Sequence, residues 1–142
     1  MIKLLDDFCT RHALPVPEPD EQGHYQLGFD NIEVSLFEDL GKLYLMAKVA
    51  LLPDKVEERK QLINKSCAYL LPYLYADECV LNLYDNEPDQ DLILVSVMAE
   101  PDGPDAFESR LAALVNRTED MMAHLEESAR TRVENRFAVF RP

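Results

Sequence analysis

The spacing of apolar residues switches between two periods along this chain, and the order of these periods restricts its fold. Residues 2–13 carry apolar side chains at the spacing of an amphipathic helix. In the three runs that follow, residues 24–30, 31–36 and 42–52, apolar and polar residues alternate as they do in half-buried strands. Because only short turns separate these runs, they predict an antiparallel meander of three strands.

The second half of the chain repeats this change of period. Residues 54–74 predict a second helix, in which Asp54 and Glu57 would form a capping box. Strands are expected at residues 79–85 and 91–99, with a polar loop between them. The later strand is apolar at nearly every position. We therefore expect both of its faces to be buried, inside the sheet or at an interface.

The turn at residues 101–105 starts a last helix, whose apolar stripe extends to Leu125. The order α-β-β-β-α-β-β-α predicts an α+β sandwich, in which helices pack on a twisted antiparallel sheet. The chain has 142 residues, which suits a single domain, and we place this domain at residues 1–128. Residues 129–142 hold four of the 14 positive charges and are interpreted as a basic C-terminal tail whose order the sequence leaves open.

Charge limits the partners of the chain. It has 27 acidic and 14 basic residues, a formal net charge of −13, although 47% of its residues are hydrophobic. Such a chain repels phosphate backbones and anionic lipids, which argues against nucleic-acid binding and membrane insertion and favours a basic or apolar protein partner. It contains neither a signal-peptide pattern nor a run of about 20 apolar residues. The sequence therefore predicts a soluble, cytoplasmic protein.

No motif for catalysis, metal binding or cofactor binding is found. The three histidines lie on separate predicted elements, and the glycines form no phosphate-binding loop. We predict no enzyme activity, no metal and no cofactor. The three cysteines are interpreted as buried thiols in a reducing compartment. One catalytic alternative remains open, a nucleophile formed by Cys9 and His12, which lie one helical turn apart.

Several apolar side chains are predicted on a second face of the sheet. Tyr44 and Met46 alternate with the leucines of their strand, and Phe37 is out of phase with its own strand. Two interpretations are open: the helices cover these groups, or the groups form an exposed patch for a partner. A sheet with open edges can also accept an added strand from an extended peptide.

Five segments read together resemble class I type III secretion chaperones, the Tir-chaperone (CesT-like) family. They are the opening LLDDFCTRHALP, the hairpin FDNIEVSLFED, the strand LYLMAKVALLP, the helix end CAYLLPYLYA and the strand DLILVSVMAE. The resemblance covers about residues 1–128. Ala13 stands where the family usually has the glycine of a glycine-leucine-proline sequence, a small departure.

The resemblance implies a bacterial, non-catalytic homodimer that needs no ATP and binds the N-terminal segment of a secreted effector. That segment would add a strand to the sheet and place apolar side chains in shallow pockets. The effector-side candidates are Leu5, Phe8, Val34, Leu36, Tyr44 and Met46. The dimer candidates are Ile63, Cys67, Leu70, Leu74, Leu92, Leu94 and Val95.

Other partners remain open at this stage. The resemblance leaves room for a contact with the secretion ATPase. The alternative function is a regulatory or scaffold domain of the same fold that sequesters a regulator protein.

Overall fold

The computed structural model describes residues 1–76, 78–98 and 103–139, with side chains up to residue 129. Its elements follow the predicted order. They are α1 (Ile2–Arg11), β1 (Tyr25–Phe29), β2 (Ile32–Asp39), β3 (Lys42–Leu51), α2 (Val56–Leu70), the 3-10 turn η1 (Leu71–Tyr73), β4 (Cys79–Asn86), β5 (Asp89–Met98) and α3 (Pro104–Val139).

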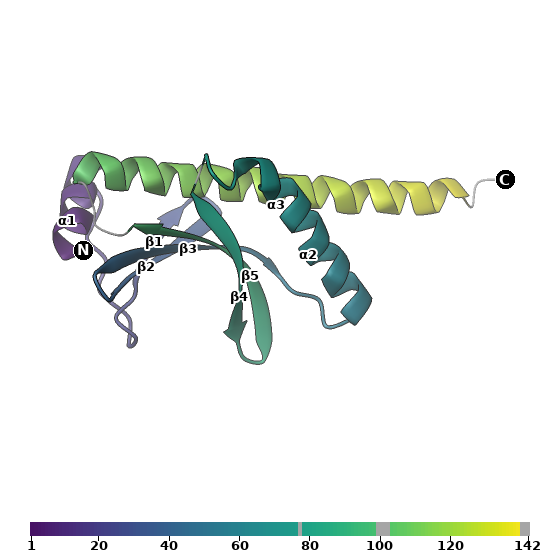
Figure 1. Cartoon of the computed structure of the whole chain (residues 1–142), viewed down its shortest axis with the longest axis horizontal. Coiled ribbons are helices and arrows are strands. Elements are labelled where there is room, and N and C mark those ends of the chain that lie inside the picture. Colours follow the sequence, from purple (N-terminus) through teal and green to yellow (C-terminus); the bar gives the residue numbers. More distant parts are fainter. Residues whose placement is uncertain (77, 99–102, 140–142) are drawn as a thin grey trace.

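The described strands form one antiparallel sheet with the order β1-β2-β3-β5-β4. The nearly continuous apolar strand, β5, lies between β3 and β4, which confirms that it is inside the sheet. From Asp91 to Met98, every residue of β5 except Val97 is buried. The outer edges of the sheet are formed by β1 and β4 (Figure 1).

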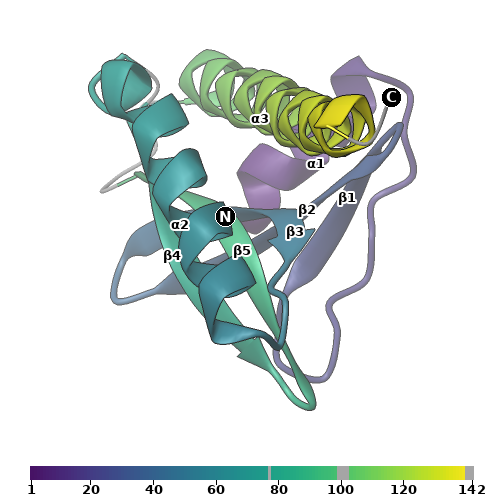
Figure 2. The ribbon, with the colours of Figure 1, turned by 90° about the vertical axis from the view of Figure 1, so that its right-hand side faces the viewer.

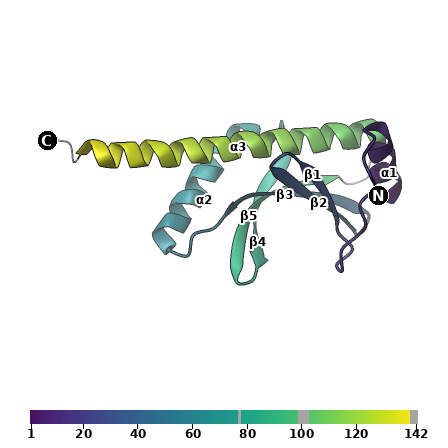
Figure 3. The same cartoon turned by 180° about the vertical axis from the view of Figure 1, so that it is seen from behind.

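The described helices all lie on one face of the sheet. Helix α3 crosses this face and contacts β2, β3 and β5, while α1 and α2 both contact α3 (Figure 2). The core lies between the two layers. It contains alternate residues of the strands, such as Val34, Leu45 and Leu94, packed with Leu114 and Met121 of α3. The described structure is thus the predicted α+β sandwich of two layers, with an open face on the sheet (Figure 3).

The prediction of a loop around residues 85–91 is wrong. The two strands continue in register to the pair Asn86 and Asp89, so only Glu87 and Pro88 form the turn, with a cis peptide bond between them. This end of the hairpin is mostly solvent exposed. Polar side chains are therefore compatible with paired strands here, because the backbone supplies the ladder of hydrogen bonds.

Two local predictions also need correction. Helix α2 begins at Val56 and its N-cap is Lys55, which makes no side-chain capping bond, so the capping box of Asp54 and Glu57 is not formed. In β3 the pairing shifts between Lys48 and Ala50. This irregularity interrupts the alternation predicted for residues 42–52, which put Leu51 on the same face as Leu43 and Leu45, and Leu51 is 51% exposed.

Helix α3 is longer than its apolar stripe predicted. Its backbone continues to Val139, so most of the segment interpreted as a basic tail is helical along its described length. Figure 1 shows this last part of α3 extending beyond α2 and away from the sheet. The boundary at residue 128 stays a prediction.

Candidate functional site

The open face of the sheet, the one opposite α3, carries a row of stacked rings. The Phe37 ring lies between those of His24 and Tyr44, with centroid distances of 4.6 and 4.8 Å and interplanar angles of 16° and 3°. Phe37 and Tyr44 are direct cross-strand partners on β2 and β3. All three side chains are half-buried. We call these three residues the aromatic row.

The open face continues from the aromatic row onto β5. Tyr44 is paired with Val97 and Met46 with Val95 across the β3–β5 ladder. Val97 and the neighbouring Val80 of β4 are exposed, although both are apolar. The alternative that the helices cover Tyr44 and Met46 therefore does not hold in this chain, because the helices lie on the other side.

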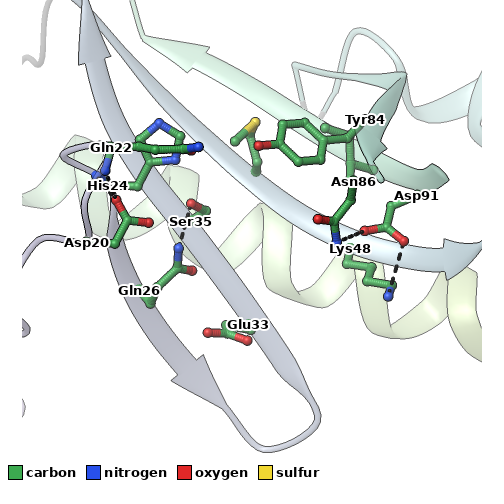
Figure 4. Close-up of a pocket in the computed structure, with 12 residues that line it drawn as sticks. Asp20, Gln22, His24, Gln26, Glu33, Ser35, Lys48, Tyr84, Asn86 and Asp91 are labelled. Atoms are coloured by element: carbon green, nitrogen blue, oxygen red, sulfur yellow. Dashed lines mark hydrogen bonds and ion pairs between the residues drawn. The ribbon is translucent and has the colours of Figure 1, made fainter. Parts of the chain in front are cut away.

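Next to the aromatic row, the open face contains a hollow of about 360 Å³. The chain before β1 supplies one wall and the β4–β5 hairpin supplies the other (Figure 4). The floor is formed by residues from the middle strands, including Ser35, Met46 and Ile93. Most of the remaining lining is polar, and we call this feature the polar hollow. Its lining includes Asp20, Gln22, His24, Gln26, Glu33, Lys48, Tyr84, Asn86 and Asp91.

Two carboxylates of the polar hollow are held in place. Oδ1 of Asp20 accepts hydrogen bonds of 2.9 Å from the backbone N–H groups of Gln22 and His24. The His24 bond is the main reason why the pKa of Asp20 is lowered. Asp91, on the opposite wall, is buried, and its Oδ1 lies 3.2 Å from Nζ of Lys48.

A second hollow, of about 550 Å³, lies between α1, the end of β1 and α3. Its lining is largely apolar and includes Phe8, Phe29 and Val115. We call it the apolar groove. The groove lies at the end of β1, which is an edge strand among the described strands.

Charged side chains lie at the mouth of the apolar groove and connect α1 to α3. His12 Nε2 is 2.7 Å from Oε1 of Glu108, and Arg11 Nη1 is 2.8 Å from Asp105 and 3.1 Å from Glu108. The hydrogen bond with His12, and then that from Arg11, lowers the pKa of Glu108. These contacts anchor the C-terminal end of α1.

A third surface of interest lies at α2 and the edge strand β4. Only Ser66 and Leu70 of the 15 residues in α2 are buried. Apolar residues remain exposed on α2, η1 and β4, as well as between them, and we call this set the α2–β4 surface: Cys67, Leu71, Tyr75 and Leu83.

The described residues offer little for catalysis. Burial raises the pKa of the Cys9 thiol, with a smaller contribution from Asp6, and a protonated buried thiol is a poor nucleophile. His12 interacts with Glu108. Within the described part of the chain, no group of three metal-ligating side chains comes together. No described helix is long and apolar enough to cross a membrane.

The effector-side candidates fall into two separate places. Leu5, Phe8, Val34 and Leu36 are buried in the core between the sheet and the helices. Tyr44 and Met46 lie on the open face and are half-buried. Phe8 of the core group also lines the apolar groove.

The dimer candidates are divided in the same way. Leu70, Leu92 and Leu94 are in the core of the chain, so their side chains present no surface to a partner. Ile63 and Leu74 are half-buried against that core, whereas Val95 is buried on the open face. Cys67 is exposed, which corrects the expectation that all three thiols are buried. The interface itself stays a prediction.

Sequence reasoning missed the polar hollow. Its walls come from residues 20–26 and from the β4–β5 hairpin, segments more than 50 residues apart in the sequence. The alternation of β5 does place Asp91 on the same face as Ile93 and Val95. That acidic residue at the start of an apolar strand was the available signal.

The family comparisons give no match, but comparison with solved structures does. No protein-family model matches the sequence, and no curated protein matches it. A complex of ExsC with ExsE matches with a TM-score of 0.62 and 24% identity, over 85% of this chain and 90% of that chain. A HopA1–SchA chaperone–effector complex matches with a TM-score of 0.59 and 21% identity, over 85% and 91%.

A further match is the Yersinia pestis type III secretion chaperone SycH in complex with a fragment of YscM2. Its TM-score is 0.53 and its identity 18%, over 84% of this chain and 98% of that chain. The chain has the fold of these chaperones. The same fold also occurs in YbjN, a putative transcription regulator from E. coli, with a TM-score of 0.57 and 13% identity over 92% and 93%. The fold therefore occurs both in chaperones and in a putative regulator, so the function of this chain has to be argued from its own surfaces.

Proposed function

We propose that this chain is a non-catalytic bacterial chaperone of the cytoplasm. In this proposal it binds the N-terminal segment of a type III secreted effector and keeps the effector soluble and competent for export. The observation that carries the proposal is the open face of the sheet, where no described helix covers the aromatic row and Val97.

The edge strand β1 offers an extended polypeptide a second place to bind, apart from the open face. An extended segment can add to a strand edge through its backbone and place alternate side chains in neighbouring pockets. Here the edge of β1 lies beside the apolar groove. An added strand would therefore have a place for an apolar side chain next to its backbone hydrogen bonds.

The fold likeness and the charge support the same proposal. Two of the matched structures are described as chaperones, one of them bound to an effector. The net charge of −13 would attract a basic client and keep the loaded complex soluble. A contact with the secretion ATPase remains a prediction.

The test is capture of the client from the cells of origin. The tagged chain is purified beside a Tyr44→Asp variant, which introduces a charge into the aromatic row. The control is Leu40→Asp, because Leu40 lies in the β2–β3 turn and is 93% exposed. We expect the wild type and the control to retain one secreted protein, and the Tyr44→Asp variant to lose it.

Limited proteolysis of the captured complex then identifies the bound region. The proposal requires protection of an extended segment near the N-terminus of the client. Recovery of no secreted protein, or equal recovery by the Tyr44→Asp variant with an unchanged melting temperature, would contradict it.

We also propose that the chain is a homodimer formed through the α2–β4 surface. Most of α2 lies outside the core, and Leu71, which follows it directly, is 67% exposed. Stable protein interfaces bury about 800 Å² per partner with an apolar centre. A second copy placed on this surface would cover α2 and the unpaired edge of β4.

The dimer is tested by light scattering after size-exclusion chromatography. We expect Leu71→Asp to give the mass of one chain, and Leu40→Asp to keep the mass of two. Leu70→Asp is not a suitable test, because Leu70 belongs to the core and a buried charge would unfold the chain. A wild-type mass of one chain at micromolar concentration would refute the dimer.

The structural likeness to YbjN favours a second candidate function. In this alternative the chain is a regulatory or scaffold domain that sequesters a regulator protein. The same capture separates the two functions. A DNA-binding regulator held by the open face, instead of a secreted protein, would support the second.

A further inference from the structure

The polar hollow has the chemistry of a site for a cation. Asp20, Glu33 and Asp91 line it together with one lysine, Lys48, so its charged side chains carry a net charge of −2. Amide and hydroxyl groups that can accept hydrogen bonds fill the space between the carboxylates, including those of Gln26 and Ser35. Its volume of about 360 Å³ is at the lower end of the usual range for ligand sites.

The carboxylate of Asp91 is a second feature of the hollow that suits a cation. The side chain is 9% exposed, and its Oδ1 forms an ion pair of 3.2 Å with Nζ of Lys48 that lacks the geometry of a hydrogen bond. The other oxygen, Oδ2, has only a long contact of 3.5 Å with Nδ2 of Asn86 (Figure 4). A buried carboxylate with unused acceptor capacity is costly unless a donor completes it.

The shape of the hollow favours arginine over lysine. A guanidinium group is planar, donates five N–H bonds in fixed directions and stacks on aromatic rings. The hollow presents carboxylates on opposite walls and two rings, those of His24 and Tyr84 (Figure 4). Lysine would offer a single ammonium group, without a planar surface to stack on the two rings.

We propose that the polar hollow binds an arginine side chain carried by an extended segment of the client. The inference rests on the proposed function for the source of that segment, and it adds the chemistry by which the client is selected. The arginine would enter from the open face, between residues 20–26 and the β4–β5 hairpin, and complete the hydrogen bonding of Asp91. The aromatic row beside His24 would support the neighbouring residues of the segment.

The test uses two synthetic peptides and does not require the client. Both are short serine-threonine peptides with blocked ends, one with a central arginine and the other with citrulline, its neutral analogue. Each is titrated into the full chain labelled with ¹⁵N. We expect the arginine peptide to shift the side-chain amide signals of Gln26 and Asn86, and the citrulline peptide to bind at least about tenfold more weakly.

Matched variants locate the binding. Asp91→Asn should weaken binding of the arginine peptide by about tenfold, whereas Asp89→Asn, an exposed residue on the same strand, should leave it unchanged. If Asp91→Asn lowers the melting temperature strongly, Glu33→Gln serves instead, because Glu33 is exposed and its loss cannot disturb the core. Equal binding of both peptides, or full binding by the Asp91→Asn and Glu33→Gln variants, would overturn the proposal.

Two further outcomes are distinct. If the client is captured but the arginine peptide does not bind, this inference fails and the proposed function stands. If the peptide binds and no client is found, the site stands and the proposed function fails. Binding that appears only after the four arginines of residues 129–142 are changed to glutamine would assign the hollow to the chain's own C-terminal segment and overturn the proposal.

Discussion

Replacing Phe8 with alanine tests whether this side chain belongs to the core or to a surface that binds a client. The resemblance to chaperones placed Phe8 on the effector side, but its side chain is only 6% exposed. Its ring contacts Phe107 of α3 edge to face, with a centroid distance of 5.8 Å and an interplanar angle of 83°. It also lies 6.4 Å from the ring of Phe29. Phe8 thus joins α1 to both layers of the sandwich.

The expected cost follows from this burial. Removing a buried phenylalanine side chain usually costs about 3–5 kcal/mol, which includes the cavity left behind. Total stabilities of domains are about 5–15 kcal/mol, so the loss is a large fraction. With a denaturant dependence of about 2 kcal/mol per molar of urea, the unfolding midpoint should fall by about 2 M.

Ile2→Ala is the matched control, because Ile2 lies on the same helix and is 58% exposed. Its effect should stay within about 0.5 kcal/mol. Urea unfolding of both variants and the wild type is followed by circular dichroism at one protein concentration, since the stability of a dimer depends on concentration. A Phe8→Ala midpoint equal to that of Ile2→Ala would refute the core placement of Phe8 and return it to the surface.

Two other expectations can be measured directly. Because the pKa of Glu108 is lowered by His12 and Arg11, its contribution to stability is present above about pH 4.5, its ordinary value, and is lost as the pH falls through the lowered pKa. The melting temperatures of the wild type and Glu108→Gln should therefore differ at pH 6 and converge towards pH 3; a difference that grows on acidification would contradict this. In the proposed dimer Cys67 is covered, so its thiol should react with DTNB quickly in the monomeric Leu71→Asp variant and slowly in the wild type, while Cys9 and Cys79 stay unreactive in both. Equal rates for Cys67 in the two proteins would argue against the α2–β4 surface.

Local patterns in the sequence were sufficient for the order of elements. Alternation in residues 32–36 placed Ile32, Val34 and Leu36 on one face, and the structure has all three in the core. The continuous apolar run of β5 predicted burial on both faces, and the structure buries Leu92 and Leu94 in the core and Ile93 and Val95 on the open face. These predictions succeeded because the period of a strand or helix is a property of the local backbone.

Local sequence patterns gave wrong predictions where pairing with a neighbouring strand determined the backbone conformation. The irregularity near Lys48 exposes Leu51, and the register of β4 with β5 removes the expected loop. Pairing of this kind depends on contacts across the sheet, and the residues of one strand do not encode it alone.

The sequence by itself determined the order of the elements in this protein and which side chains share a face of a strand or helix, because spacing along the element sets the direction of each side chain. It also determined that Tyr44 and Met46 oppose the leucines of their strand. Only the tertiary structure decided that the described helices lie on one face, which leaves those two residues on the open face and encloses Leu5 and Phe8. It alone brought Asp20 and Asp91 to one hollow, because the approach of distant segments depends on how the whole sheet pairs and curves.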